Sequence, residues 1–294
     1  MIKQLTPHFP DYELIDTGEG EKLERFANFV VRRPEPQAIW RKSLGEAAWL
    51  KADASFLRDQ RSEERGEWRM KPEMPSRWQM RFNYKGMHLT MRLALTSFKH
   101  VGIFPEQAAN WEFIYDTVEE LRGAGIERPK VLNLFAYTGG ATLAAKSAGA
   151  DVTHVDSVKQ VVTWSKENME QSGLDGVRWI VEDAMKFVER EVRRGNRYNG
   201  IILDPPAYGR GANGEKWVLE DDICRMLECC AELLERENAF LVLNLYSMGL
   251  SAMLARTAVH QAFGAPRSEQ MGELYFEDRS HKQIPFGTYY RFRR

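Results

Sequence analysis

The expected fold of this chain of 294 residues follows from one stretch, Val131-Leu-Asn-Leu-Phe-Ala-Tyr-Thr-Gly-Gly140. Its first half is a short apolar run, typical of a buried strand, and its second half is a turn that ends in two glycines. A helix over 141–147 is predicted to follow. Backbone N–H groups point outward at such a junction, and glycine lets a ligand approach the main chain because it has no Cβ atom. The stretch therefore indicates a ligand site, and the segments after it decide which kind.

Strands and helices alternate from residue 130 onward. Strands are predicted over 131–135, 152–156, 177–181, 200–203 and 240–245, and helices over 141–147, 158–171, 184–194, 218–235 and 250–263. This alternation favours a Rossmann-like α/β fold with a mostly parallel sheet that is covered on both faces. Two last strands, over 273–276 and 288–292, are separated only by a loop, so we expect them to form a C-terminal antiparallel hairpin at one sheet edge.

The first 105 residues are rich in aromatic and turn residues. Short strands are predicted over 26–31 and 37–40, and a β-hairpin over 76–93, whose second arm alternates apolar and polar residues. Pro105 suits the first position of a helix that ends near Gly123. We therefore divide the chain into a small β-rich N-terminal domain over 1–105, expected to recognise the substrate, and an α/β domain over 106–294.

Carboxylates stand where three predicted strands end, which is the edge at which open α/β sheets bind ligands. Asp156 ends the second strand and can accept both ribose hydroxyls of an adenosine. Asp183 can accept from the exocyclic amine of adenine, or can simply cap the next helix. The fourth strand ends in Asp204-Pro-Pro-Ala-Tyr208, which offers a carboxylate, carbonyls and a ring for an amine on a planar group. The simpler alternative is that these residues only end the strand.

In this order, Asn133-Leu-Phe-Ala-Tyr-Thr-Gly-Gly140, Asp156, Glu182-Asp183 and the segment over 204–208 resemble class I S-adenosylmethionine-dependent methyltransferases. The resemblance is greatest to bacterial large-subunit ribosomal RNA methyltransferases of the cytosine-5 and guanine-N7 types. It covers about residues 98–294 and includes Gly102-Ile-Phe-Pro-Glu-Gln107. It implies S-adenosylmethionine as the cofactor and RNA as the substrate.

The resemblance also implies which residues form the site. The turn over 135–139 would hold the methionine part, Asp156 and Ser157 the ribose, and Asp183 and Ala184 the adenine. The implied cofactor contacts are Phe104, Gln107, Phe135, Ala136, Tyr137, Thr138, Gly139, Asp156, Ser157, Asp183, Ala184 and Asp204. The implied catalytic residues are Asp204, Pro205, Pro206 and Tyr208, which would face the methyl group and the substrate.

The segment Tyr246-Ser-Met-Gly249 differs from the cytosine-5 enzymes, which have a nucleophilic cysteine where Ser247 stands. A hydroxyl without an adjacent base is a far weaker nucleophile than a thiolate. We therefore favour methylation of a nitrogen, with Asp204 and the Pro205 carbonyl accepting its proton or charge and Tyr208 stacking on the substrate. The N-terminal RNA-binding motif of the family is also replaced by the β-rich segment.

Two segments carry basic residues suited to RNA phosphates. Eight basic and two acidic residues lie between Arg65 and Lys99, with aromatic residues between them, and we select Arg77, Arg81 and Lys85 as tentative contacts. A hairpin with a solvated face and an aromatic core face explains the same pattern without a partner, and we favour it slightly. The glycine-rich loop over 209–216 offers Arg210 and Lys216 in the same way, or is an ordinary surface loop.

Composition limits the other possibilities. The net charge is −1, so no global field attracts nucleic acid or a membrane. The chain has no apolar leader or spanning segment, and its three cysteines cluster on one predicted helix, which indicates reduced thiols, a cytoplasmic protein and no metal site. Oligomeric state is not indicated.

Three other functions are compatible with parts of this pattern. The first is an NAD-dependent oxidoreductase, which the turn disfavours because it lacks GxGxxG. The second is a methyltransferase of a protein side chain or a small molecule, and the third is a non-catalytic module that binds the cofactor or RNA.

Overall fold

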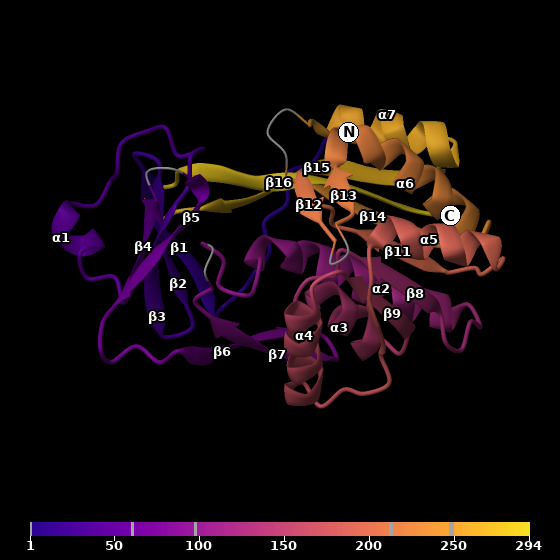
Figure 1. Ribbon diagram of the computed structural model, residues 1–294, viewed down its shortest axis with the longest axis horizontal. Coiled ribbons are helices and arrows are strands. Elements are labelled where there is room, and N and C mark those ends of the chain that lie inside the picture. Colours follow the sequence, from indigo (N-terminus) through magenta and orange to yellow (C-terminus); the bar gives the residue numbers. More distant parts are fainter. Residues whose placement is uncertain (1, 60–61, 97–98, 212–213, 247–249) are drawn as a thin grey trace.

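A computed structural model describes residues 2–59, 62–96, 99–211, 214–246 and 250–294, without the side chains of 59 and 62–65. Its centre is a seven-stranded sheet in the order β10-β9-β8-β11-β14-β16-β15 (Figure 1). The strands are β8 (Lys130–Leu134), β9 (Asp151–Asp156), β10 (Arg178–Val181), β11 (Gly200–Leu203), β14 (Phe240–Leu245), β15 (Ser268–Glu277) and β16 (Gln283–Arg293). The first five are parallel and the last two antiparallel, as predicted.

Two layers of helices cover this sheet because neighbouring strand residues alternate between its faces. Val131 and Ile202 face one core, whereas Leu132 and Ile201 face the other. The first core receives α2 (Ala108–Gly123), α3 (Gly140–Ser147) and α4 (Lys159–Gln171), and the second receives α5 (Ala184–Arg193), α6 (Leu219–Leu233) and α7 (Ala252–Phe263). The short 3-10 helix η1 (Pro105–Gln107) leads into α2. None of the described helices combines the length and the low charge needed to cross a membrane.

The N-terminal region contains a second sheet in the order β1-β2-β3-β4-β5. Its elements are β1 (Tyr12–Gly18), β2 (Glu21–Phe26), β3 (Phe29–Pro34), β4 (Ala54–Asp59), β5 (Ser62–Met70) and the short helix α1 (Glu46–Trp49). The strand predicted over 26–31 is wrong, because Ala27 adopts a φ of 54° in a turn that joins β2 to β3. The strand predicted over 37–40 is also wrong, since this apolar segment is a loop whose Ala38 is buried without strand pairing.

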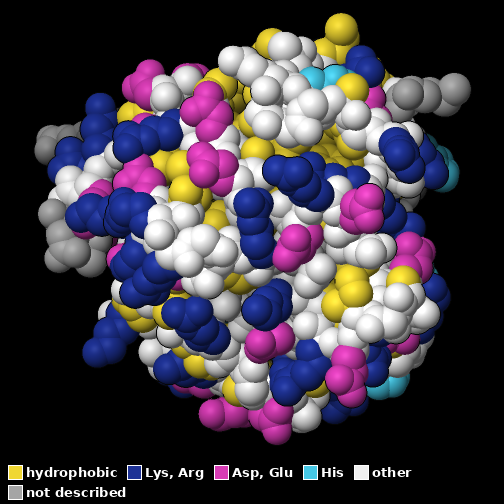
Figure 2. Space-filling view, turned by 90° about the vertical axis from the view of Figure 1, so that its right-hand side faces the viewer, with side chains coloured by type: hydrophobic (Ala, Val, Ile, Leu, Met, Phe, Trp, Pro, Cys, Tyr) yellow, Lys and Arg dark blue, Asp and Glu magenta, His cyan; other side chains and the backbone are white. Residues whose placement is uncertain are grey.

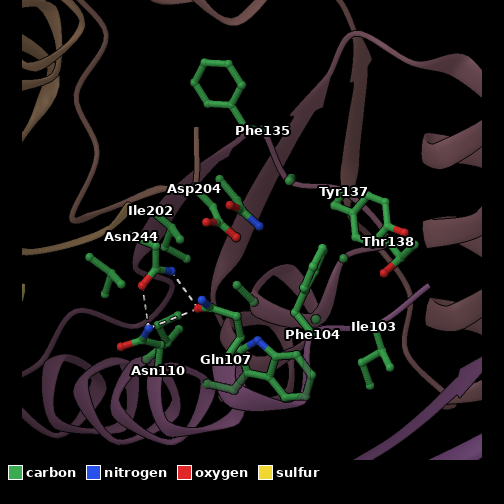
Figure 3. Close-up of a pocket in the computed structure, with 18 residues that line it drawn as sticks. Ile103, Phe104, Gln107, Asn110, Phe135, Tyr137, Thr138, Ile202, Asp204 and Asn244 are labelled. Atoms are coloured by element: carbon green, nitrogen blue, oxygen red, sulfur yellow. Dashed lines mark hydrogen bonds between the residues drawn. The ribbon is translucent and has the colours of Figure 1, made fainter. Parts of the chain in front are cut away.

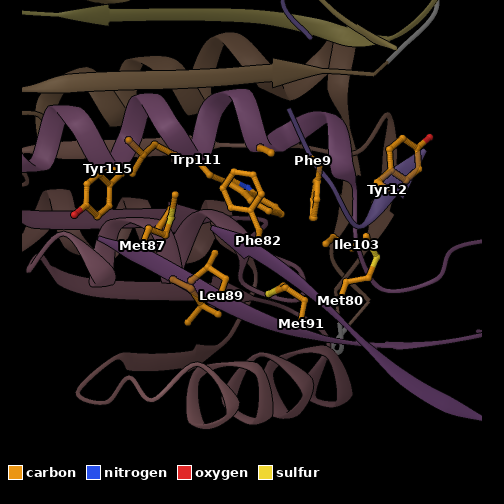
Figure 4. Packing of buried hydrophobic residues seen from close by; sticks show 14 of the residues in the cluster. Phe9, Tyr12, Met80, Phe82, Met87, Leu89, Met91, Ile103, Trp111 and Tyr115 are labelled. Carbon is orange, nitrogen blue, oxygen red and sulfur yellow. The ribbon is translucent and has the colours of Figure 1, made fainter. Parts of the chain in front are cut away.

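The predicted hairpin is confirmed and packs onto the α/β core. It consists of β6 (Arg77–Tyr84) and β7 (Met87–Ala94). The apolar face of β7 and Phe82 of β6 surround Trp111 of α2 (Figure 4), with 5.5 Å between the rings of Phe82 and Trp111. Trp78 is also buried and donates its indole N–H to the Phe26 carbonyl. Two of the rings considered for base stacking are therefore core residues, as the simpler interpretation expects.

Side chains of α4 complete the hydrogen bonding of the hairpin. Asn168 accepts from the Arg92 amide at 2.8 Å, and the Ser172 hydroxyl accepts from the Thr90 amide at 3.0 Å. Trp164 donates its indole N–H to the Arg92 carbonyl at 3.0 Å. The hairpin thus bridges the N-terminal sheet and the α/β region, and the proposed boundary at residue 105 stays a prediction.

Gly140, the first residue of α3, is required by packing. A Cβ atom there would lie 2.2 Å from Cζ2 of Trp111. We expect Gly140→Ala to lower the free energy of unfolding by about 1–3 kcal/mol, because the buried indole cannot move without disturbing its neighbours. Urea denaturation measures this, with Gly123→Ala as the control, since a Cβ atom at the end of α2 meets nothing within 4 Å. Equal stability of both variants would contradict this packing.

Candidate active site

The turn after β8 has an unusual backbone. Phe135 and Tyr137 adopt φ values of 55° and 49°, and Gly139 adopts 92°, so three residues within five lie in the left-handed region. For a residue other than glycine this conformation is unfavourable and persists only when the surrounding structure enforces it. The Ser165 hydroxyl donates to the Tyr137 carbonyl at 2.6 Å, and the Thr138 hydroxyl donates to the Gly102 carbonyl at 2.7 Å. The turn is therefore held from α4 and from the segment before α2.

Asp156 connects this turn to the end of β9. Its Oδ2 atom accepts from the Tyr137 amide at 3.0 Å, and its Oδ1 atom accepts from the Val158 amide at 2.9 Å. Burial raises the pKa of Asp156, and the two N–H donors partly oppose this rise. Each carboxylate oxygen has a second lone pair, so the group can accept two further hydrogen bonds from a ligand.

A cleft of about 1280 Å³ lies between the N-terminal sheet and the carboxyl ends of the central strands. Its walls include Lys22 and Arg33 of the N-terminal sheet and Glu106 of η1. Of the residues selected from the sequence, it is lined by Phe104, Phe135, Tyr137, Asp156, Ser157, Asp183, Ala184, Asp204, Pro205, Pro206 and Arg210.

A smaller pocket of about 40 Å³ continues from this cleft, with which it shares Phe104 and Asp204 (Figure 3). It adds the remaining selected residues Gln107, Ala136, Thr138 and Gly139. All twelve residues implied to contact the cofactor thus line one or both of two adjoining cavities. The selected residues that line neither cavity are Tyr208, Lys216, Arg77, Arg81 and Lys85.

Asp204 stands at the end of β11. Its Oδ1 atom is inaccessible to water and has no hydrogen-bond partner among the described residues. Burial and the nearby Glu106 raise the pKa of Asp204 to about 7. An unpaired buried carboxyl oxygen is unfavourable by itself, so it indicates a group that receives a ligand donor.

The prolines after Asp204 are held by aromatic packing. The Trp217 indole donates to the Pro206 carbonyl at 2.8 Å, and its ring centre lies 4.8 Å from that of Phe135. The Pro206 carbonyl is thereby occupied, which leaves the Pro205 carbonyl and the Asp204 carboxyl to meet a substrate amine. Neither proline offers an N–H donor that would compete for these acceptors.

The segment after the prolines differs from the expected loop. Its ends form a short ribbon of β12 (Tyr208–Arg210) and β13 (Lys216–Val218). Tyr208 is 51% exposed, and its hydroxyl accepts from Nε of Arg210 at 2.8 Å. The predicted loop over 209–216 therefore needs correction, because its ends pair as strands before α6 begins.

Asp183 caps a helix and also lies at the wall of the cleft. Its Oδ1 atom accepts from the Lys186 amide at 3.0 Å, which caps α5. The residue also lines the cleft beside Ala184. Capping therefore does not remove it from the site.

The sequence analysis did not assign a role to Glu106 or Tyr246, which also line the cleft. Glu106 follows Pro105 at the predicted start of a helix, where an acidic residue is common whatever its role. Tyr246 directly precedes Ser247, the residue compared with the cysteine of the cytosine-5 enzymes, which is outside the described residues. Tyr246 could have been predicted to line the site because it directly follows β14, at the same sheet edge as Asp204.

Comparison with known proteins identifies the family. Residues 95–228 match the family described as conserved hypothetical protein 95. A crystal structure of the SAM-dependent methyltransferase from Agrobacterium tumefaciens is 38% identical, with a TM-score of 0.90 over 99% of this chain and 93% of that chain. This chain belongs to the S-adenosylmethionine-dependent methyltransferases. The cofactor of this methyltransferase is S-adenosylmethionine.

Part of this methyltransferase is similar in sequence to ribosomal RNA methyltransferases. Ribosomal RNA large subunit methyltransferase K/L of Shewanella frigidimarina is 30% identical over 49% of this chain and 19% of its own length. Ribosomal RNA large subunit methyltransferase I of Aeromonas salmonicida is 27% identical over 55% of this chain and 40% of its own length. The chain thus spans about a fifth to two fifths of these relatives. SMU.776, a putative methyltransferase whose crystal structure contains SAH, shares the fold at 17% identity and a TM-score of 0.69 over 96% of this chain and 74% of that chain.

The strand-end residues fit the chemistry of the cofactor. The methyltransferase offers carboxylate lone pairs at Asp156 for two hydroxyls and an open main-chain turn over 135–139 for the amino-acid part. Its unpaired Asp204 oxygen stands in the same space. The described part of the chain holds no group of three or more His, Cys, Asp or Glu side chains arranged to bind a metal ion.

Proposed function

We propose that this methyltransferase transfers the methyl group of S-adenosylmethionine to a nitrogen of a ribosomal RNA base. The observation that carries this proposal is the unpaired Oδ1 atom of Asp204, which is followed by two prolines at the end of β11 and lines the wide cleft. The names of the curated relatives support RNA as the substrate. A ribosomal substrate also implies a cytoplasmic enzyme.

The residues that would hold the cofactor follow the strand ends. The turn over 135–139 would receive the methionine part, with Phe104 and Gln107 on the other side. Asp156 and Ser157 would bind the ribose, and Asp183 and Ala184 would contact the adenine. When bound, the cofactor supplies an electrophilic methyl group on a sulfonium.

Asp156→Ala is expected to weaken S-adenosylmethionine binding at least about tenfold, because hydrogen bonds to a charged group contribute roughly 1.5–3 kcal/mol each. The substitution also removes the acceptors of the Tyr137 and Val158 amides. Calorimetric titration measures the affinity, with NAD as a second ligand. Asp151→Ala at the opposite, exposed end of β9 is the matched control. Unchanged affinity in Asp156→Ala would place the ribose elsewhere.

The groups near the proposed position of the methyl group suit a nitrogen as the atom that is methylated. The nitrogen must aim its lone pair at the methyl group, and its N–H must meet an acceptor. Asp204 and the Pro205 carbonyl provide this acceptor, and the exposed ring of Tyr208, which lies outside the cleft, is free to stack on a part of the substrate that stays outside it. This arrangement needs no nucleophilic residue.

The N-terminal region over 1–105 is proposed to recognise the RNA. On the face shown in Figure 2, Lys and Arg side chains alternate with Asp and Glu, so no single-sign surface is displayed there. Arg77 and Arg81 lie on the exposed face of β6, whereas Lys85 is paired with Asp116 at 2.6 Å. Arg210 is the selected cation that lines the cleft. RNA affinity that falls with salt and with neutralisation of Arg77 and Arg81 supports this role.

A methyl-transfer screen tests the proposal. Tritium-labelled S-adenosylmethionine is offered with large-subunit ribosomal RNA, assembled subunits, a peptide pool and a metabolite pool. Labelled RNA is then digested to nucleosides, and mass spectrometry identifies the methylated atom. A nitrogen-methylated base is the expected product. Label in peptides or metabolites alone would overturn the RNA assignment, and a carbon-methylated base would overturn the nitrogen assignment.

A further inference from the structure

Glu106 is a buried carboxyl group in the wall of the cleft that the chemistry above does not use. It belongs to η1 and is 4% exposed. Charged and titratable groups face it from several elements. They are Tyr12 of β1, Lys22 and Glu24 of β2, Arg33 of β3, Asp204 after β11 and Tyr246 after β14.

A chain of hydrogen bonds behind Glu106 has one direction. It begins at Arg291, whose guanidinium can only donate and whose Nη1 atom lies 3.2 Å from Oδ1 of Asn110. The Asn110 amide must therefore turn its Nδ2 atom toward Gln107, where it donates to Oε1 at 3.0 Å. Asn244 donates to the same oxygen at 2.6 Å. These two donors occupy Oε1 of Gln107 (Figure 3), so its Nε2 atom is available to donate to Tyr246.

This direction sets the role of the Tyr246 hydroxyl. Gln107 donates to the Tyr246 oxygen at 2.6 Å, so the hydroxyl accepts on that side. Its own hydrogen is left for Oε1 of Glu106, at 3.5 Å. The network therefore turns a donor toward Glu106, which at this distance favours the ionised carboxylate only weakly.

Glu106 and Asp204 are coupled through their charges. Burial raises the pKa of Glu106 to about 7, and Lys22 and Arg33 oppose this rise. Burial followed by the charge of Glu106 raises the pKa of Asp204 to about 7 as well. Two carboxyl groups in one buried space titrate as a pair, since ionisation of one disfavours ionisation of the other. A cation that enters the cleft favours the doubly ionised pair.

We propose that Glu106 is a further catalytic residue, which shares with Asp204 the task of taking the proton from the methylated nitrogen. This inference rests on the proposed nitrogen methylation. The nitrogen lone pair forms the N–C bond, the C–S bond breaks with its electron pair on sulfur, and the N–H proton passes to the carboxylate pair. Tyr246 is then a positioning residue, because it acts through Glu106.

The first test needs no acceptor substrate. S-adenosylmethionine, which carries the sulfonium charge, and S-adenosylhomocysteine, which lacks it, are titrated at pH 7 in two buffers of different ionisation enthalpy. The wild-type protein is expected to release protons with the sulfonium ligand and far fewer with the neutral one. Glu106→Gln is expected to lose at least half of this release. Glu273, which lines the same cleft from β15, provides the control, and Glu273→Gln is expected to release as many protons as the wild type.

The second test uses the substrate found in the methyl-transfer screen. Glu106→Gln is expected to lower kcat by about 10–100-fold, as removal of a general base does, and to change the KM for the cofactor less than kcat. Tyr246→Phe is expected to move the acid limb of the pH profile to higher pH. Thermal denaturation of each variant identifies simple misfolding.

The outcomes separate this inference from the proposed function. Unchanged proton release together with unchanged kcat in Glu106→Gln would overturn the role of Glu106, whatever the substrate is. Absence of labelled RNA would overturn the substrate assignment, and the proton release would still report on the carboxyl pair.

Discussion

Asp204→Asn is expected to lower methyl transfer by about 10²–10⁴-fold, the range for removal of a group that acts on the reacting atoms. Asparagine has nearly the shape of aspartate, but it has no negative charge and cannot take a proton. The Oδ1 atom of Asp204 has no partner among the described side chains and backbone groups, so its role requires a ligand. Single-turnover transfer from labelled S-adenosylmethionine measures the effect.

The dependence on pH has a definite sign. A base must be ionised, and the pKa of Asp204 is raised to about 7. The rate should therefore rise as the pH increases through about 7 and fall toward acid, and Asp204→Asn should leave, at its low residual rate, only the part of this dependence that belongs to Glu106.

Cofactor affinity provides the control for this prediction. In Asp204→Asn it should fall far less than the rate, because the ribose and adenine contacts are elsewhere and only the attraction of one carboxylate for the sulfonium charge is lost. Asp221→Asn, at an exposed position in the first turn of α6, should leave both rate and affinity unchanged. Full turnover by Asp204→Asn on a verified substrate would refute the proposed chemistry.

Glu24→Gln is expected to lower the free energy of unfolding by about 3–5 kcal/mol, because it leaves the buried Arg33 without its carboxylate partner. Glu24 is 1% exposed and receives two hydrogen bonds from Arg33, at 2.7 and 2.8 Å. The Tyr12 hydroxyl donates to it at 2.9 Å, and Lys22 lies 3.5 Å away. Urea denaturation followed by circular dichroism gives the difference from wild type.

Glu21→Gln on the same strand is the matched control. Glu21 pairs with Arg32 and Lys42, but it keeps contact with solvent, so its loss should lower stability by only about 0–1 kcal/mol. Similar losses in the two variants would show that burial does not decide the contribution of these pairs.

The stabilisation by the Glu24–Arg33 pair should also depend on pH, in a direction that follows from the pKa of Glu24. Burial alone would raise the pKa of Glu24, but Arg33, Lys22 and the Tyr12 hydroxyl hold it below its ordinary value. The stabilisation is therefore complete above the ordinary glutamate pKa and is lost as the pH falls through the lower value of the folded state. The difference in the free energy of unfolding between wild type and Glu24→Gln should therefore become smaller as the pH falls through that acid range.

Much of the α/β region could be predicted from local pattern. The bounds of β11 and β14 agree with the sequence prediction, because each is a largely apolar run that the fold buries on both faces. The strand-end residues Asp156, Asp183 and Asp204 could be found for the same reason, since a parallel sheet brings the carboxyl ends of its strands to one edge.

The N-terminal region was harder to predict. The turn at Ala27 lies inside an apolar run, and its positive φ is not encoded by a glycine. The aromatic rings of the β6–β7 hairpin were compatible with a surface that binds nucleic acid and also with a hydrophobic core. Only their contacts with α2 show that they belong to the core. Glu106 had no local signal, because its neighbours come from strands about 70 to 140 residues away in sequence.

The sequence by itself determined the order of strands and helices in the α/β region and the acidic residues at the strand ends, which depend on periodicity and on residue type at a given position and are therefore local properties. The cofactor class was implied by the resemblance of these motifs to a known family. Only the tertiary structure decided that the hairpin rings are buried, that Asp204 has an unpaired oxygen and that Arg291 orients the bonds leading to Tyr246. These depend on burial and on partners distant in sequence, and the same properties set the charge of the carboxyl groups in the cleft.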